Sequence, residues 1–150
     1  MRLLPLITFA ASLIALASAQ GIDIGAPLAG STISPGQNIT VEVDRPNSLT
    51  GSEEVAIVIS MVPCETSTCN SPNQDLSSEL GYVLYNGPYS PQYDSITPPD
   101  HKPPYQNFSV QVPSWYTSGE HIALAVTHVS LVGAGPWVLL EFKNVSLVVD

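Results

Sequence analysis

Residues 38–44 read NITVEVD, a strict alternation of polar and apolar residues. Successive side chains of a β-strand point to opposite faces, so this pattern predicts a strand that buries Ile39, Val41 and Val43. Residues 107–112 read NFSVQV and repeat the alternation. Two half-buried strands of this kind indicate antiparallel sheets with one face on a core and the other in water.

The rest of the chain continues in short apolar runs separated by Gly, Pro, Asn and Ser, with no long helical period. Residues 54–62 are nearly continuous apolar sequence, which is typical of a central strand covered on both faces. Further strands are expected at residues 22–24, 32–33, 80–85, 121–132 and 137–149. About seven or eight strands predict an all-β fold, an immunoglobulin-like antiparallel β-sandwich without the disulfide that joins the sheets of antibody domains.

The expected strand at residues 137–149 changes phase along its length. Val138 and Leu140 belong to one alternation, whereas Val145 and Leu147 belong to the other. A regular strand would send one of these sets to solvent. We therefore predict a β-bulge near Lys143 and Asn144 that keeps both sets inside.

The N-terminus predicts the compartment. Residues 1–19 combine Arg2, an apolar run and a small-residue exit at Ala17, Ser18 and Ala19, which is the pattern of a secretory signal peptide. A retained membrane anchor is the weaker interpretation, because the run is shorter than the roughly 20 residues that span a bilayer. We expect residues 20–150 to form a single secreted, extracellular domain.

The charge of the chain argues against several classes of partner. Lys and Arg number 4 against 13 Asp and Glu, for a formal net charge of −9. No basic stripe is present that could neutralise phosphates or bind an anionic membrane surface. We expect neither nucleic-acid binding nor membrane insertion, and no apolar tail closes the sequence to suggest a lipid anchor.

Cys64 and Cys69 are the only cysteines. In an oxidising exterior such a pair predicts a local disulfide that fixes one loop. A zinc site would need two further ligands, and His101, His121 and His128 show no paired metal-ligand spacing. We expect no metal and no other cofactor.

Three sequons predict N-glycosylation, at Asn38, Asn107 and Asn144. Asn38 and Asn107 both fall on the polar side of their alternating strands. Two independent patterns therefore agree on which side of these strands faces water.

A proline- and tyrosine-rich segment, residues 82–105, is expected to be mostly a long loop. Its candidate recognition residues are Tyr85, Tyr89, Tyr93 and Tyr105. Prolines restrict the chain, and tyrosines offer amphipathic contact area at low entropic cost, so the loop could be a preorganised binding surface. The alternative, which we favour, is that the tyrosines pack the loop onto its own sheet.

The sequence contains no convincing catalytic motif. Residues 131–136, LVGAGP, mimic a dinucleotide fingerprint, but no helix pattern follows, and a hairpin turn explains them better. Glu53 and Glu54 point to opposite faces of a strand and cannot flank one glycosidic bond, so we interpret them as turn and edge charges. His128 shares the inward phase of its strand and is expected to be a core imidazole. We expect a protein without enzymatic activity.

Four short stretches together carry a family resemblance. They are SPG at residues 34–36, VDRPNSLTGS at 43–52, LYNGP at 84–88 and LVGAGP at 131–136. With them, most of residues 25–149 resembles the fungal necrosis-inducing secreted effector family. The resemblance implies a small secreted protein that binds host immune receptor-associated kinases and can induce necrosis, with no catalytic residues.

Two function hypotheses follow from these observations. The first is a secreted, non-enzymatic interaction protein of the effector kind. The second is a cell-wall or carbohydrate-binding module, because Trp115, Trp137 and the tyrosine loop could serve as platforms on which sugars stack.

Overall fold

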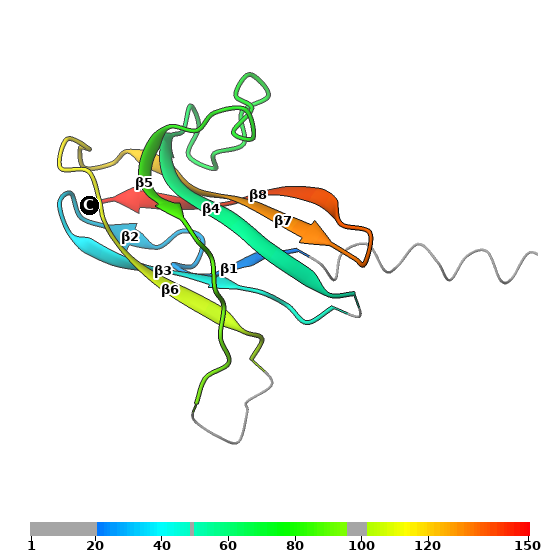
Figure 1. Cartoon of the computed structure of the whole chain (residues 1–150). Helices are drawn as coiled ribbons and strands as arrows, with labels where there is room; N and C mark the ends of the chain where they lie inside the picture. Colours follow the sequence, from blue (N-terminus) through cyan, green and yellow to red (C-terminus); the bar gives the residue numbers. More distant parts are fainter. Residues whose placement is uncertain (1–20, 49, 96–101) are drawn as a thin grey trace, which may run out of the picture.

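The computed structural model describes residues 21–48, 50–95 and 102–150. The described residues form eight strands, and Figure 1 shows them in two facing layers. The strands are β1 (Asp23–Ala26), β2 (Thr32–Ile33), β3 (Asn38–Asp44), β4 (Ser52–Pro63), β5 (Tyr82–Gly87), β6 (Tyr105–Gln111), β7 (His121–Val132) and β8 (Trp137–Val149). The predicted all-β class and strand number are confirmed.

The strands form a three-stranded sheet, β1-β3-β6, and a five-stranded sheet, β2-β8-β7-β4-β5. One pairing departs from the expected antiparallel arrangement, because β2 runs parallel to the end of β8. All other described pairings are antiparallel. The reason is that β2 is a two-residue strand that follows a loop from the other sheet, so no hairpin fixes its direction.

The core lies between the two sheets, where the alternating residues of the sequence meet. Val41 of β3 is opposite Phe108 of β6, and both side chains are buried. Ile57 and Ile59 of β4 and Leu124 of β7 are fully buried in the facing sheet. The predicted inward phases of β3, β6 and β7 are confirmed.

The expectation that β4 is covered on both faces is correct only for its second half. Val55 is 49% exposed, whereas Ser60, Met61 and Val62 are all buried. The cover on the outer face comes from residues 64–81, which project from the five-stranded sheet (Figure 1). Their side chains Cys69 and Leu76 pack with Val62 and Ala123 in a second, smaller apolar cluster. The predicted disulfide between Cys64 and Cys69 lies in this segment.

The predicted bulge in β8 is wrong. β8 pairs with β7 in unbroken register from Trp137 opposite Val132 to Val148 opposite His121. Lys143 and Asn144 are therefore ordinary ladder residues, and one apolar set faces solvent instead. Val138 is 65% exposed and Leu140 is 67% exposed. β8 keeps its continuous hydrogen-bond ladder with β7, and the side chains of Val138 and Leu140 stay exposed as a result.

Parts of the sequence analysis fall beyond these residues. The described residues include no helix, and hence none that could cross a bilayer. The expected signal peptide at residues 1–19, His101 and the prolines Pro98 and Pro99 lie outside the described residues.

Candidate recognition surface

Two of the four candidate tyrosines are used inside the molecule. Tyr89 is only 3% exposed, and its hydroxyl donates a hydrogen bond of 3.1 Å to the carbonyl oxygen of Val43. The Tyr85 ring packs on Phe108 with 4.7 Å between centroids, and its hydroxyl donates to the carbonyl of Pro88. These two side chains hold the segment after β5 onto the sandwich and leave little surface for a partner.

The other two tyrosines face outward. Tyr93 is 59% exposed, and its hydroxyl donates a 2.7 Å hydrogen bond to Oδ1 of Asn47. Tyr105 is half-buried at the start of β6, and Lys102 Nζ lies 4.0 Å from the centre of its ring. Of the four, Tyr93 is therefore the main candidate for contact with a partner.

One end of the sandwich brings together two of the segments that carry the family resemblance, and we call it the loop end. It consists of the β3–β4 connection, the β7–β8 turn, and the residues Ser90, Pro91 and Pro104. A shallow pocket there has Arg45 and Glu54 among its lining residues, beside the connection at residues 46–51. Two of the four resembling stretches, residues 43–52 and 131–136, contribute lining residues here. Residues 84–88 lie in β5 and just after it, opposite the middle of β4. The fourth, residues 34–36, lies next to Val112 at the opposite end.

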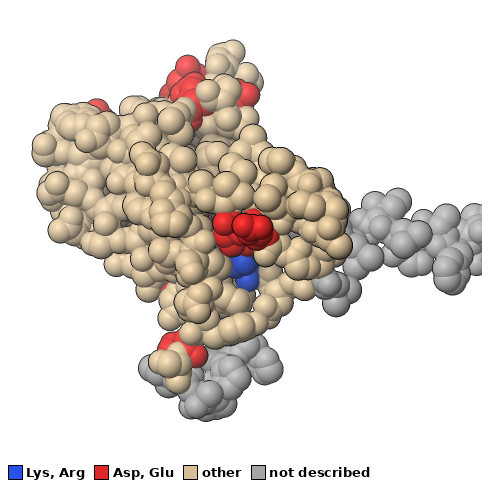
Figure 2. All heavy atoms as spheres, in the orientation of Figure 1, with Lys and Arg blue, Asp and Glu red and all other residues tan. Residues whose placement is uncertain are grey.

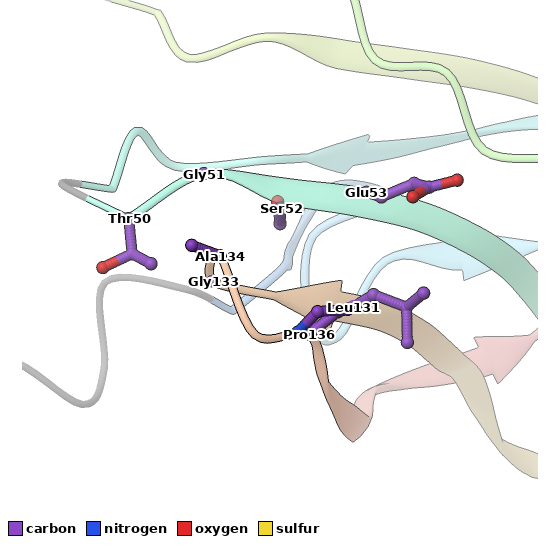
Figure 3. A pocket seen from close by; sticks show the side chains of 8 residues that line it. All are labelled: Thr50, Gly51, Ser52, Glu53, Leu131, Gly133, Ala134 and Pro136. Atoms are coloured by element: carbon purple, nitrogen blue, oxygen red, sulfur yellow. The ribbon is translucent and has the colours of Figure 1, made fainter.

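A second shallow pocket adjoins the first (Figure 3). Figure 3 shows Thr50 and Gly51 of the β3–β4 connection beside Gly133 and Ala134 of the β7–β8 turn. The backbone N–H of Gly133 donates a 3.0 Å hydrogen bond to the carbonyl of Gly51, which ties the two segments together. Gly133 has a φ of +87°, a conformation that favours glycine in a hairpin turn. Residues 131–136 are thus a hairpin turn, as expected, and not a phosphate-binding loop.

The floor of the loop end is an ion pair between the two sheets. Arg45 Nε lies 2.9 Å from Glu54 Oε1, and Arg45 Nη2 donates to Ser52 Oγ over 2.7 Å. Arg45 Nη1 donates to the carbonyl of Gly21 at 3.2 Å. Arg45 is only 7% exposed, so its guanidinium is a fixed part of the framework. On the face drawn in Figure 2, basic atoms form one small patch directly beside an acidic one.

Behind this ion pair lies a fully buried histidine, His128 of β7. Its Nε2 contacts Oε2 of Glu54, and its Nδ1 lies 3.1 Å from Oε2 of Glu141. The edge of the His128 ring also meets the ring of Tyr89, at 5.4 Å between centroids. Both ring nitrogens of His128 therefore face a carboxylate oxygen.

These contacts change the pKa of the Glu54 carboxyl group. Burial alone raises the pKa of a carboxyl group, but hydrogen bonds from His128 and Arg45 and their positive charges outweigh it and lower the Glu54 pKa to about 2. Glu54 is therefore ionised at any physiological pH. Burial also raises the pKa of the Tyr89 hydroxyl, with the nearby charge of Glu54 as the next cause.

The geometry of this buried network does not fit a metal site. The two carboxylates approach His128 from opposite ring nitrogens, so the three groups cannot converge on one ion. Among the described residues, no group of three or more His, Cys, Asp or Glu side chains is placed to hold a metal. The network is a structural element that supports the loop end.

Most of this network was not predicted from the sequence. Glu53 and Glu54 do lie on opposite faces, but the interpretation of Glu54 as a turn or edge charge is wrong, because it points inward to Arg45. His128 is the core imidazole that its phase predicted. A usable signal was the single acid at Glu141 between the apolar residues Leu140 and Phe142, a pattern that indicates a charge with an internal partner.

The sequon asparagines are all exposed. Asn38 and Asn107 lie on the outer face of the three-stranded sheet, and Asn144 lies on the outer face of the five-stranded sheet. None of the three lines the loop end. Glycans at these positions would leave the loop end open.

The two tryptophans lie far apart. Trp115 is 59% exposed and meets Tyr82 edge to face, with 4.7 Å between ring centroids. Tyr82 pairs with Met61, near one end of β4. Trp137 lies at the other end of β4, because it pairs with Val132, and Val132 pairs with Ser52. At about 3.3 Å per residue, the two ends of β4 are about 30 Å apart. Trp115 and Trp137 therefore cannot contribute to one sugar-binding platform.

The sequence model of the Nis1 family matches residues 17–147, which covers both sheets and the whole loop end. No curated protein matches the chain.

Proposed function

The chain belongs to the Nis1 family, and from that premise we propose that it is a secreted effector that acts by binding a host protein at its loop end. The family match extends over all eight strands except the last two residues of β8. The resemblance of residues 43–52, 84–88 and 131–136 to necrosis-inducing secreted effectors suggests the class of partner, a plant immune receptor-associated kinase. Induction of necrosis is the expected consequence in the host.

The observation that carries this proposal is that two of those stretches, the β3–β4 connection and the β7–β8 turn, lie together at one end of the fold. Separate connections usually give a protein its binding specificity when a rigid scaffold holds them. Here the hydrogen bond from Gly133 to Gly51 and the ion pair of Arg45 with Glu54 hold the connections in place. The exposed ring of Tyr93 stands beside them, fixed by its hydrogen bond to Asn47. A tyrosine fixed in this way contributes contact area at a low entropic cost.

The proposal includes the absence of catalysis. Both ring nitrogens of His128 already face carboxylates, and the ring is fully buried, so it has no nitrogen that could take a proton from a substrate. The other histidine among the described residues, His121, starts β7 on the opposite side of the molecule from the loop end.

The proposal also places the protein outside the cell. A local disulfide between Cys64 and Cys69 persists in an oxidising compartment, and all three sequon asparagines are accessible to the glycosylation machinery. These features agree with the signal peptide expected at residues 1–19.

A pull-down with the mature protein tests the proposal. We expect immobilised residues 20–150 to capture a receptor-associated kinase from plant extract, in parallel with an established family member as reference. The variant Tyr93→Ala removes the main exposed ring of the loop end, and we expect it to weaken capture by about ten-fold or more. Trp115→Ala is the matched control, because Trp115 is equally exposed at the opposite end.

Two results would contradict the proposal. The first is that the chain captures no kinase while the reference protein does. The second is that Trp115→Ala abolishes capture while Tyr93→Ala leaves it unchanged, which would move the binding surface to the other end of the sandwich. Leaf necrosis after infiltration of the same variants gives a second readout.

Carbohydrate binding is the second candidate, favoured by the exposed edge-to-face pair of Tyr82 and Trp115. Sugars stack on exposed aromatic rings of this kind. Sedimentation with chitin, glucan and cellulose tests this candidate: we expect Trp115→Ala to abolish any binding and Tyr93→Ala to preserve it. Protein that remains in the supernatant with all three polymers counts against it.

A further inference from the structure

Among the residues that the structure describes, the outer edge of β8 is paired with another strand only near its end. The carbonyl of Ser146 accepts from the N–H of Gly30, and the N–H of Val148 donates to the carbonyl of Ser31. Even-numbered residues of β8 therefore direct their backbone groups away from β7. β2 covers this edge only at Val148 and Val149. Within the described part of the chain, no strand pairs with the same edge from Trp137 to Val145.

The side chains along this open edge are apolar. Val138 and Leu140 are 65% and 67% exposed, and Phe142 is half-buried. These three even-numbered residues present both unpaired backbone groups and apolar side chains on the outer sheet face. Natural proteins normally protect an edge strand of this kind with charges, proline or a covering segment. The open edge is thus an unusual feature in a chain with a net charge of −9.

We propose that the open edge binds a second copy of this chain, with β8 antiparallel to the partner's β8 about a two-fold axis at Leu140. Leu140 is then opposite the partner's Leu140, and Val138 is opposite the partner's Phe142. Each of these pairs exchanges two backbone hydrogen bonds, because all of these residues direct their backbone groups to the open edge. The two five-stranded sheets become one continuous sheet.

The sequence of β8 is what favours a second copy over an unrelated partner. The apolar residues at positions 138, 140 and 142 are symmetric about Leu140, so the edge is complementary to itself. The charges agree with this register. Lys143 falls opposite the partner's Trp137, an uncharged residue, and its ammonium lies 3.5 Å from Oδ1 of Asp23 in its own chain. Glu141 falls opposite the partner's Leu139 and keeps its contact with His128, so no like charges meet. This inference depends on β8 alone and not on the proposed host partner.

Sedimentation of the mature protein over micromolar to millimolar concentrations tests the association. We expect a reversible dimer for the wild type, and for Leu140→Lys an increase of the dimer dissociation constant by about ten-fold or more, since like charges then face each other. Leu80→Lys is the control, because Leu80 is 50% exposed on the segment near β5, and we expect it to dimerise like the wild type. A wild type that stays monomeric at every concentration, or a Leu140→Lys variant that still dimerises, overturns the proposal.

Oxidative cross-linking tests the register with a conservative change. Residues in a hydrogen-bonded antiparallel pair have Cα atoms about 5.5 Å apart, within the range of a disulfide. We expect Leu140→Cys to form a covalent dimer on a non-reducing gel. Val55→Cys, which is 49% exposed on the same sheet but away from the edge, is expected to stay monomeric. Equal cross-linking of both variants, or none at position 140, contradicts the pairing.

Discussion

Arg45 Nε donates to Glu54 Oε1 over 2.9 Å, and this ion pair joins the two sheets of the sandwich. Arg45 follows β3 of the three-stranded sheet, and Glu54 lies in β4 of the five-stranded sheet. The other carboxylate oxygen of Glu54 contacts His128, so one side chain connects the buried guanidinium of Arg45 with the fully buried imidazole ring. The loop end thus lies on a base with fixed charges, and not on apolar packing alone.

Replacement of Glu54 by Gln is expected to destabilise the fold strongly. It leaves the guanidinium of Arg45 and the imidazole of His128 buried without their shared carboxylate. Removal of one partner from a buried ion pair costs about 3 kcal/mol of unfolding free energy. Chemical denaturation at neutral pH measures this loss.

The neighbouring acid provides the control for this change. Glu53 is exposed on the outer sheet face, so Glu53→Gln is expected to change the unfolding free energy by less than about 0.5 kcal/mol. Equal effects of the two substitutions would show that Glu54 has no special role in stability.

The Glu54 carboxylate is expected to make the unfolding free energy depend on pH. The Glu54 pKa is about 2 in the folded chain and 4.5 in the unfolded reference, so its stabilisation is complete above pH 4.5 and is lost as pH falls toward 2. We expect the loss to be about 2 kcal/mol once solvent screening is included. Unfolding free energies of the wild type and Glu54→Gln between neutral and acid pH measure it. The difference between the two proteins must shrink as pH falls, and a constant difference would contradict the assignment.

Most of the strands could be predicted because alternation is a local signal. Val41, Phe108 and Leu124 face the core as their phase indicates, since strand geometry alone decides the side on which a residue lies. The failure at β8 has a physical cause. We assumed that Val138 and Leu140 must be buried, but a bulge would have broken the continuous ladder with β7. The sequence does not reveal whether exposing these two side chains or breaking the hydrogen-bond ladder costs more free energy.

The loop end could be predicted only in part. The turn at residues 131–136 and the inward phase of His128 follow from local sequence. The network of Arg45, Glu54 and Glu141 does not, because its members come from three strands or their ends and meet only after the sheets pair. The inward direction of Glu54 was also difficult to predict because β4 is irregular there. Its register with β7 shifts between Glu54 and Ala56.

Replacement of Asp44 by Asn is expected to stabilise the protein slightly. Asp44 lies opposite Asp23 across β1 and β3, and its Oδ1 is buried without a hydrogen-bond partner among the described residues. Burial raises the pKa of Asp44, Glu42 raises it further, and Lys102 opposes them. Like charges opposite each other in a sheet cost about 0.5 kcal/mol, which Asp44→Asn regains near neutral pH.

Denaturation near neutral pH measures the effect of Asp44→Asn, and a second aspartate gives a control of opposite sign. The pKa of Asp75 is lowered by hydrogen bonds from Ser77, so Asp75→Asn is expected to lose stability. The gain from Asp44→Asn is expected to diminish as acid protonates Asp44 in the wild type. A loss of stability for Asp44→Asn at neutral pH would contradict this account.

Removal of the disulfide is expected to loosen the outer cluster and leave the sandwich folded. Cys64 and Cys69 close a loop with a sequence separation of 5, and the chain-entropy model assigns so short a loop about 2 kcal/mol. Cys69 packs with Val62 and Leu76 on the outer face of β4 and β7, whereas the main core lies on the other face. The double variant Cys64→Ala, Cys69→Ala is therefore expected to lose about 2 kcal/mol of unfolding free energy. Hydrogen exchange is expected to accelerate first within residues 64–81, because they depend on this loop for their packing. If exchange accelerates equally in β3 and β6, the disulfide supports the whole fold and the local role assigned to it is wrong.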